Sequence, residues 1–288
     1  MKKHIIKLIV VLSMACISPY VFTEESTSFA PQWEIGDSWS IKGALYSDNN
    51  LYSMSGDNTP KENIRKAYPF TADFNVTKII STNDFKTPYR PSSVKERVRY
   101  NNMEHPEGGY KCFEIQVAFP KGEDGSQSKY ILYIRIDTMN LIRILNNSVR
   151  SDGSVIDLIN DYCIDPNGPL FTTYVRSTIP FDWPDWRKKD INVNGESKIK
   201  VQQIKEITFS DKDGKSYDGL EITMGEKNRE NDKYVSRSII KWKKGQPWWS
   251  EIKQYDYNGE ISRDIEIVIE KEDGNNKVGE HSEKIVNK

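Results

Sequence analysis

Histidine, the side chain most often used for acid–base catalysis near neutral pH, is scarce in this chain. The three histidines are His4, His105 and His281, and only His105 lies outside the two terminal segments. His105 belongs to the stretch Met-Glu-His-Pro-Glu-Gly-Gly, whose Pro and Gly residues favour a solvated turn between two strands. A turn of this kind is not the setting of a general base, which needs a fixed substrate within hydrogen-bond reach. We therefore expect no histidine-based catalytic centre.

The cysteines do not supply a metal centre either. Cys16 lies near the N-terminus, and Cys112 and Cys163 lie far apart in the rest of the chain. One histidine and two distant cysteines do not give the ligand spacing of a zinc site. In an oxidising compartment the pair Cys112 and Cys163 is expected to form a disulfide, which would close a loop of about 50 residues and contribute about 4 kcal/mol. Two buried free thiols are the alternative.

Other catalytic and cofactor motifs are missing. The chain has neither a G-x-S-x-G nucleophile elbow nor a glycine loop that could hold phosphates. Asp211–Asp218 begins like a calcium loop but lacks the later ligands, so a hairpin turn is the better interpretation. A hydrolase using two carboxylates would need them about 5–10 Å apart, and no motif pairs any two acids. We expect a non-enzymatic protein with no cofactor and no metal, and rank a hydrolase third among the possible functions.

Large aromatic side chains are the remaining candidates for a functional site. The segment Ser177–Trp186 carries Phe181, Trp183 and Trp186 around two prolines, which resist both helix and central strand. Bulky aromatics on irregular backbone either plug the end of a barrel or meet a partner. The plug is expected, because burial is the usual fate of large apolar side chains.

Two adjacent tryptophans, Trp248 and Trp249, raise the same question near the C-terminus. If they begin a strand over 248–257, they point to opposite faces of the sheet. Apolar features are then expected on both sides, either a covering loop or a concave face that holds an apolar ligand. The candidate ligand-binding residues are therefore Phe181, Trp183, Trp186, Trp248 and Trp249.

The N-terminal segment indicates where the protein resides. Three lysines precede the apolar run Leu8–Ala15 within residues 1–23, the pattern of a bacterial export signal. The run is shorter than the about 20 residues that span a bilayer, and no other stretch could form a transmembrane segment. Cys16 is a candidate for lipid attachment, and cleavage near Thr23 is the alternative. We expect an exported protein of the periplasm or the outer-membrane periphery.

Composition narrows the class of protein further. The chain has 288 residues, of which 29% are charged and 36% hydrophobic, and its formal net charge is −1. These values are typical of a globular protein. The small net charge gives no sign of a nucleic-acid partner.

Alternation of apolar and polar residues dominates the rest of the sequence and predicts half-buried strands. Asp-Gly and Asn-Gly pairs between the alternating runs favour tight hairpins. The expected strands are 38–46, 70–80, 94–100, 113–119 and 130–136, followed by a meander over 198–209, 217–224, 233–243, 248–257 and 261–270. Short helices are expected near Thr59 and over Ser154–Cys163. The sequence thus predicts one mainly β domain over 24–273, built on an antiparallel sheet that two short helices interrupt, and a polar flexible tail over 274–288.

Three segments resemble a known family. The strand–turn–strand of 130–145 resembles the Asp-x-x-Thr hairpin of LolA-like periplasmic proteins, and 247–259 is similar to their Asp-x-x-Gly hairpin. The stretch 31–39 resembles the openings of uncharacterised exported bacterial proteins. The resemblance implies a strongly curved antiparallel sheet, an unclosed β-barrel with one or two short covering helices. It also implies that the concave face holds acyl chains of lipoproteins or other lipids, without chemistry.

Two functions follow from these expectations. The first is a cell-envelope protein that binds a lipid or a lipidated partner in the concave face of a β half-barrel. The alternative is a structural or interaction module of the envelope that docks onto protein or glycan through exposed aromatic side chains.

Overall fold

A computed structural model describes residues 30–48, 65–91, 94–162, 181–210 and 214–271. The expected export signal, Cys16, the helix near Thr59, Cys163 and the polar tail lie outside these residues, so the predictions about them are untested.

The described strands form a single antiparallel sheet. They are β1 (Ser38–Asp48), β2 (Arg65–Ser81), β3 (Lys111–Ala118), β4 (Lys129–Arg135), β5 (Leu141–Asn146), β6 (Leu158–Asp161), β7 (Asp190–Asn194), β8 (Lys198–Ser210), β9 (Ser216–Asn228), β10 (Tyr234–Lys243), β11 (Glu251–Tyr255) and β12 (Ile261–Lys271). Their spatial order is β6-β5-β4-β3-β2-β1-β12-β11-β10-β9-β8-β7. Strands that are neighbours in the sequence therefore pair with each other, except β6 and β7, and the pairing of β1 with β12 joins the two halves.

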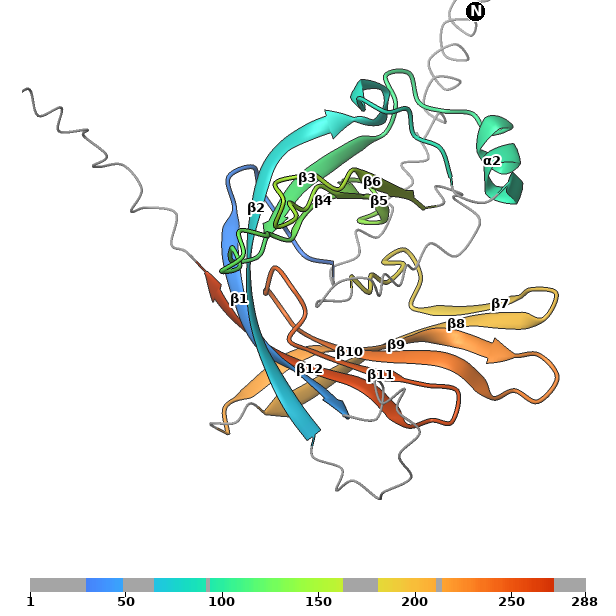
Figure 1. Ribbon diagram of the computed structural model, residues 1–288. Helices are drawn as coiled ribbons and strands as arrows, with labels where there is room; N and C mark the ends of the chain where they lie inside the picture. Colours follow the sequence, from blue (N-terminus) through green and yellow to red (C-terminus); the bar gives the residue numbers. More distant parts are fainter. Residues whose placement is uncertain (1–29, 49–64, 92–93, 163–180, 211–213, 272–288) are drawn as a thin grey trace, which may run out of the picture.

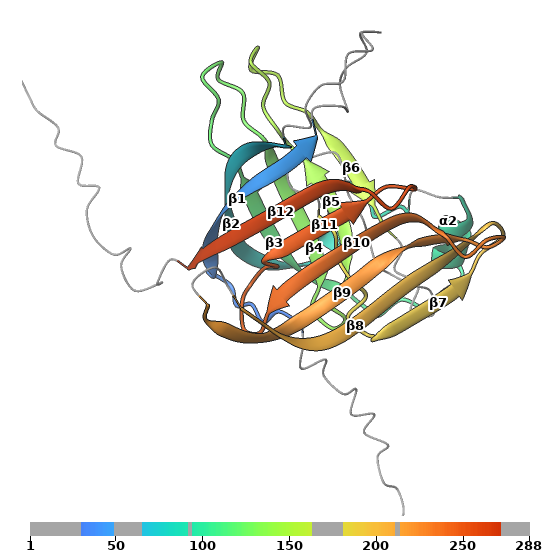
Figure 2. The same ribbon diagram turned by 90° about the horizontal axis from the view of Figure 1, so that it is seen from below.

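The sheet bends back on itself without closing. Figure 1 shows the half from β2 to β6 facing the half from β7 to β12, and the view from below in Figure 2 shows the strands of the two halves crossing. Among the described strands, the end strands β6 and β7 do not pair with each other. The predicted fold class, a strongly curved unclosed antiparallel sheet, is confirmed.

The main core lies between the two halves. Alternate residues of many strands point into it, such as Trp39 and Ile41 of β1 and Phe74 and Val76 of β2. All seven tryptophans of the chain belong to this core: Trp33, Trp39, Trp183, Trp186, Trp242, Trp248 and Trp249. The concave face is thus lined by large aromatic side chains that pack against one another.

A second, smaller core lies on the opposite face of β3 to β5. It contains Phe85, Tyr89, Cys112, Tyr133 and Ile142. The alternation along β3, where Cys112 enters this core and the next residue enters the main one, places the two cores on opposite faces. The chain between β2 and β3 covers this second face, with the 3-10 helix η2 (Thr82–Asp84) and the α-helix α2 (Val94–Asn101).

Two predicted elements are wrong. Residues 94–100 lie in α2 instead of a strand. The four-residue spacing of Val94 and Val98 fits one face of a helix as well as one face of a strand. In addition, β2 and β3 are each already paired with a strand on both sides, so they offer no free edge to a further strand. The expected helix over Ser154–Cys163 is replaced by β6, because this segment completes the hydrogen bonding of β5. Tertiary pairing here outweighs a weak helical periodicity.

The predicted C-terminal meander is confirmed as β8 to β12, with one difference at its fourth strand. That strand begins at Glu251, so Trp248 and Trp249 lie on irregular backbone before β11. The strict alternation of faces does not apply there, and both indoles enter the main core. The expectation that they point to opposite faces was wrong for this reason. In the described part of the chain, no helix has the length and apolar character needed to cross a membrane.

Candidate functional site

The five aromatic residues proposed from the sequence come together in the main core. Phe181, Trp183, Trp186, Trp248 and Trp249 are each at most 3% exposed. The Trp183 ring lies 5.3 Å from that of Trp248 and 6.1 Å from that of Trp186, between ring centroids. They fill the space between the two halves of the sheet, as a plug would, and they present no exposed aromatic patch.

Hydrogen bonds hold the aromatic segment, residues 181–186, against both halves of the sheet. The indole Nε1 of Trp183 donates to the carbonyl of Met139, in the turn between β4 and β5, at 2.5 Å. On the other half, Gln254 of β11 donates through Nε2 to Asp182 at 2.8 Å. A ligand among these aromatics would have to displace side chains that are already packed and anchored.

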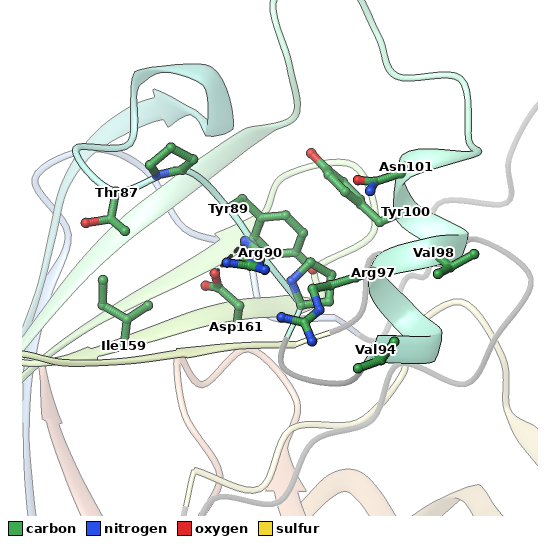
Figure 3. A pocket seen from close by; sticks show the side chains of 12 residues that line it. Thr87, Tyr89, Arg90, Val94, Arg97, Val98, Tyr100, Asn101, Ile159 and Asp161 are labelled. Atoms are coloured by element: carbon green, nitrogen blue, oxygen red, sulfur yellow. Dashed lines mark hydrogen bonds between the residues drawn. The ribbon is translucent and has the colours of Figure 1, made fainter.

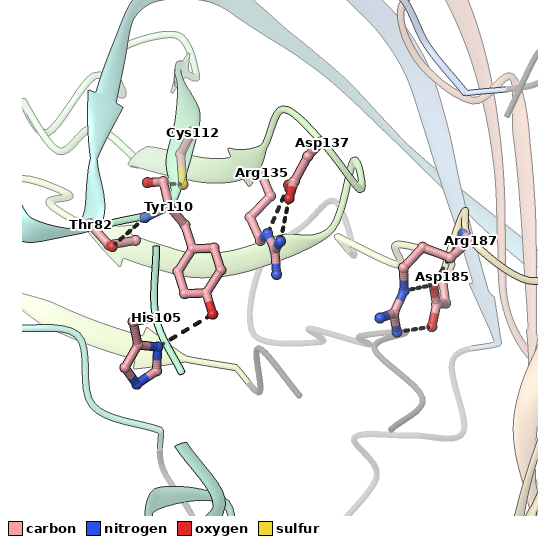
Figure 4. Close-up of polar contacts among 8 residues, drawn as sticks. All are labelled: Thr82, His105, Tyr110, Cys112, Arg135, Asp137, Asp185 and Arg187. Carbon is pink, nitrogen blue, oxygen red and sulfur yellow. Dashed lines mark hydrogen bonds and ion pairs between the residues drawn. The ribbon is translucent and has the colours of Figure 1, made fainter. Parts of the chain in front are cut away.

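Further hydrogen bonds hold the C-terminal end of the aromatic segment, at Asp185. Asp185 accepts two hydrogen bonds from the guanidinium of Arg187, at 2.9 and 2.8 Å (Figure 4). Gln202 of β8 accepts from the backbone N–H of Asp185 at 2.8 Å and donates back to its carbonyl at 2.9 Å. These contacts satisfy buried polar groups and make the segment part of the fold.

The space that the described side chains leave open lies elsewhere, beside α2. A groove of about 810 Å³ runs between the 87–91 loop, α2 and β6 (Figure 3), a volume within the range of small-molecule sites. Its lining residues are Thr87, Pro88, Tyr89, Arg90, Pro91, Val94, Arg97, Val98, Tyr100, Asn101, Ile159 and Asp161. Since Tyr89 and Tyr100 pack with the second core, we place the groove on the sheet face opposite the tryptophans. A second pocket, of about 460 Å³, lies between β2 and the β3–β4 loop, and none of the described residues that line it is charged.

One wall of the groove is apolar. Val94 and Val98, one helical turn apart on α2, are 68% and 55% exposed, and Ile159 and two prolines add to the surface. Apolar side chains four residues apart share one face of a helix. Within the described residues, therefore, α2 presents an uncovered apolar face to the groove.

The polar part of the groove is positively charged. The guanidinium groups of Arg90 and Arg97 reach into it (Figure 3). Among the described residues of its lining, Asp161 is the only carboxylate, and it already accepts from the buried guanidinium of Arg143 at 2.5 and 2.8 Å. Two cations therefore face the groove with no anion left to balance them among its described lining residues.

The Arg143–Asp161 pair also builds the groove. Arg143 donates to the carbonyls of Thr87 and Pro88 at 2.7 and 3.1 Å, and Asp161 accepts from the backbone N–H of Arg90 at 2.7 Å. The loop that carries Arg90 is thereby tied to β5 and β6. Both charged side chains are nearly buried, which strengthens their interaction relative to a surface pair.

The C-terminal end of α2 is held by contacts between aromatic rings. Tyr89 and Tyr100 meet edge to face, with centroids 5.0 Å apart. His105 lies with Nε2 2.8 Å from the carbonyl of Tyr100 and Nδ1 3.3 Å from the hydroxyl of Tyr110 (Figure 4). Burial raises the pKa of Tyr100 and of Tyr110, so both remain neutral phenols. His105 therefore supports the turn after α2.

Cys112 lies in the second core, against which Tyr100 and Tyr110 also pack. Its side chain is buried, and burial raises the pKa of its thiol to about 12. Since Cys163 lies outside the described residues, the disulfide remains a prediction. No group of three or more potential metal ligands occurs within the described ranges.

Sequence reasoning did not identify Arg90, Arg97, Val94 and Val98 as site residues. The signal that could have found them is the four-residue spacing of the two valines with an arginine between them, which also suits an amphipathic helix. The interpretation of this stretch as a strand concealed that signal.

No family model matches this chain, and no curated protein matches it significantly. Two solved structures match it. One is a β-barrel-like protein of the domain of unknown function DUF1849 from Brucella abortus, with 9% identity, a TM-score of 0.37, and coverage of 83% of this chain and 100% of that chain. The other is a DUF1329 family protein from Desulfovibrio piger, with 10% identity, a TM-score of 0.36, and coverage of 83% and 87%. Because both structures are at most 10% identical to this chain, we assign the site from the geometry of this chain alone.

Proposed function

We propose that this protein is a non-enzymatic bacterial cell-envelope protein, of the LolA-like carrier type, that binds a lipid or a lipidated partner. The observation that carries the proposal is the groove beside α2, where Val94 and Val98 present an apolar face to a volume of about 810 Å³. The export signal expected in residues 1–23 and the resemblance of three segments to LolA-like proteins support the same function.

The proposed site differs from the one that the resemblance implies. A ligand in the concave face would have to displace Trp183 and Trp248, which are buried and in contact. The groove requires no such displacement, because Val94 and Val98 are already exposed. We therefore place the ligand beside α2.

Titration with the fluorescent fatty acid cis-parinaric acid tests the proposal. We expect saturable binding by the wild-type protein and a loss of about tenfold or more in affinity in Val94→Asp/Val98→Asp, because a charge in an apolar contact is costly to desolvate. Both valines are exposed, so the variant should fold. The matched control, Val155→Asp/Val268→Asp, alters two valines that are 60% and 65% exposed elsewhere, and should bind like the wild type. Absence of saturable binding by the wild type would contradict the proposed function.

Tryptophan emission reports which face is occupied. None of the described residues lining the groove is a tryptophan, whereas the main core contains all seven. This measurement is made without cis-parinaric acid, because the probe itself quenches tryptophan by energy transfer from either face. Addition of laurate alone should leave the wavelength of maximal tryptophan emission unchanged, and a shift of that wavelength would instead place the ligand in the concave face.

A further inference from the structure

We propose that the groove beside α2 selects an anionic amphiphile with a single chain. Its carboxylate or phosphate pairs with Arg90 and Arg97, and its hydrocarbon chain lies along Val94, Val98 and Ile159. This inference rests on the proposed function and adds the chemistry of the head group to it.

The first argument is the balance of charge in the groove. Of the residues that the structure describes, two guanidinium groups and one carboxylate line it, and that carboxylate, Asp161, is bound by the buried Arg143. On α2 itself, Glu96 and Arg99 make contacts of their own and are not part of the lining. Arg90 and Arg97 therefore remain to receive an anion.

The second argument is the chemistry of arginine. Its planar guanidinium matches the two oxygens of a carboxylate or phosphate and is less strongly hydrated than an ammonium group. Arg90 and Arg97 come from opposite walls, the 87–91 loop and α2, and both side chains lie between α2 and β6 in Figure 3. An anion placed between the walls would contact both cations.

The third argument is the arrangement of the apolar surface. Arg97 stands on α2 between Val94 and Val98, so the cation and the apolar face belong to the same helix and the same groove. A small inorganic anion would leave the valines exposed, and a neutral chain would leave the guanidinium groups without a partner. An anionic head joined to an apolar chain satisfies both.

Arg90 is held in place for this role by its backbone. Its N–H donates to Asp161 at 2.7 Å, and Arg143 binds the two carbonyls of Thr87 and Pro88 just before it. The loop is therefore fixed while the side chain of Arg90 stays exposed. Such a fixed loop lowers the entropy lost when a ligand binds.

Competition against cis-parinaric acid with ligands of equal chain length tests the inference. Laurate and monododecyl phosphate should displace the probe at concentrations about tenfold or more below that needed for dodecanol, because hydrogen bonds to a charged group exceed those to a neutral one. Inorganic phosphate alone should not displace it. Whichever of these two ligands displaces the probe at the lower concentration identifies the preferred head group as carboxylate or phosphate.

The variant Arg90→Gln/Arg97→Gln keeps the polar side chains but removes both charges. We expect it to lose the preference for laurate over dodecanol, to within about threefold, with an unchanged affinity for dodecanol. The matched control is Arg229→Gln, an exposed arginine in the turn between β9 and β10, which should retain the preference.

The possible results separate the two proposals. Equal displacement by laurate and dodecanol in the wild type, or an unchanged preference in Arg90→Gln/Arg97→Gln, overturns the head-group inference while lipid binding stands. A wild-type protein that binds neither the probe nor any of the dodecyl ligands overturns the proposed function itself.

Discussion

Removal of the buried ion pair between Arg143 and Asp161 should destabilise the protein far more than removal of a surface pair. The two side chains are only 4% and 5% exposed, and two hydrogen bonds of 2.5 and 2.8 Å join them. Each also holds backbone groups of the 87–90 loop. Arg143→Met would leave the Asp161 carboxylate buried without its cation, and Asp161→Leu would leave the guanidinium without its anion.

The magnitude follows from the cost of an uncompensated buried charge. Each single variant should lose about 3–5 kcal/mol of unfolding free energy. The double variant Arg143→Met/Asp161→Leu removes both charges together, so it should lose less than the sum of the singles by about 2–3 kcal/mol. The remaining loss reflects loop carbonyls and an N–H left without partners, at about 1–3 kcal/mol each.

Urea denaturation followed by far-ultraviolet circular dichroism measures these free energies. The matched control is the surface pair Lys198–Glu226, whose nitrogen–oxygen distance is 2.8 Å and whose side chains are 49% and 31% exposed. Lys198→Met should cost less than about 1 kcal/mol, because solvent screens an exposed pair. If Arg143→Met costs no more than Lys198→Met, or if the cycle is additive, the reasoning about the buried pair is wrong.

Three further predictions concern acid stability, thiol reactivity and the aromatic core. Burial by itself raises the pKa of Glu251, but hydrogen bonds from Lys253 and Lys241 outweigh it and lower that pKa below 4.5. Glu251→Gln should therefore cost up to about 1 kcal/mol above pH 4.5, and this cost should decrease as the pH falls from 4.5 through the lower pKa of the folded state; a constant difference between urea titrations across pH would refute this. Under reducing conditions at pH 8, iodoacetamide should label Cys112 only after unfolding, because burial raises its pKa to about 12; rapid labelling of the native protein, seen by mass spectrometry, would contradict this. Trp183→Phe should cost about 1 kcal/mol more than Trp248→Phe in thermal unfolding, since Trp183 donates to Met139 whereas the Trp248 indole N–H has no acceptor among the described residues; equal costs would argue against that bond.

Much of the sheet followed from local pattern. The alternation along 70–80, 113–119 and 130–136 matches β2, β3 and β4, and the C-terminal meander matches β8 to β12. Alternation is reliable here because one face of each strand packs into a core, and a shift by one residue would expose the whole apolar set. The buried state of the aromatic segment was also expected from its composition.

The candidate site could not be derived in the same way. The groove joins the 87–91 loop, α2 and Ile159 and Asp161 of β6, which are separated by up to about seventy residues in the sequence. Its charge depends on Arg143 of β5 binding Asp161, a contact created by the pairing of β5 with β6. A local pattern contains no information about such a neighbour.

The amino-acid sequence alone determined that the chain forms antiparallel hairpins and buries its large aromatics, because both properties depend on side chains that follow one another at short, regular spacing. The tertiary structure decided which segments complete the sheet edge, why Trp248 and Trp249 share one core, and where exposed valines and two arginines meet. Those outcomes depend on hydrogen bonds and ion pairs between distant segments, whose free energy exceeds the small local preference for helix or strand.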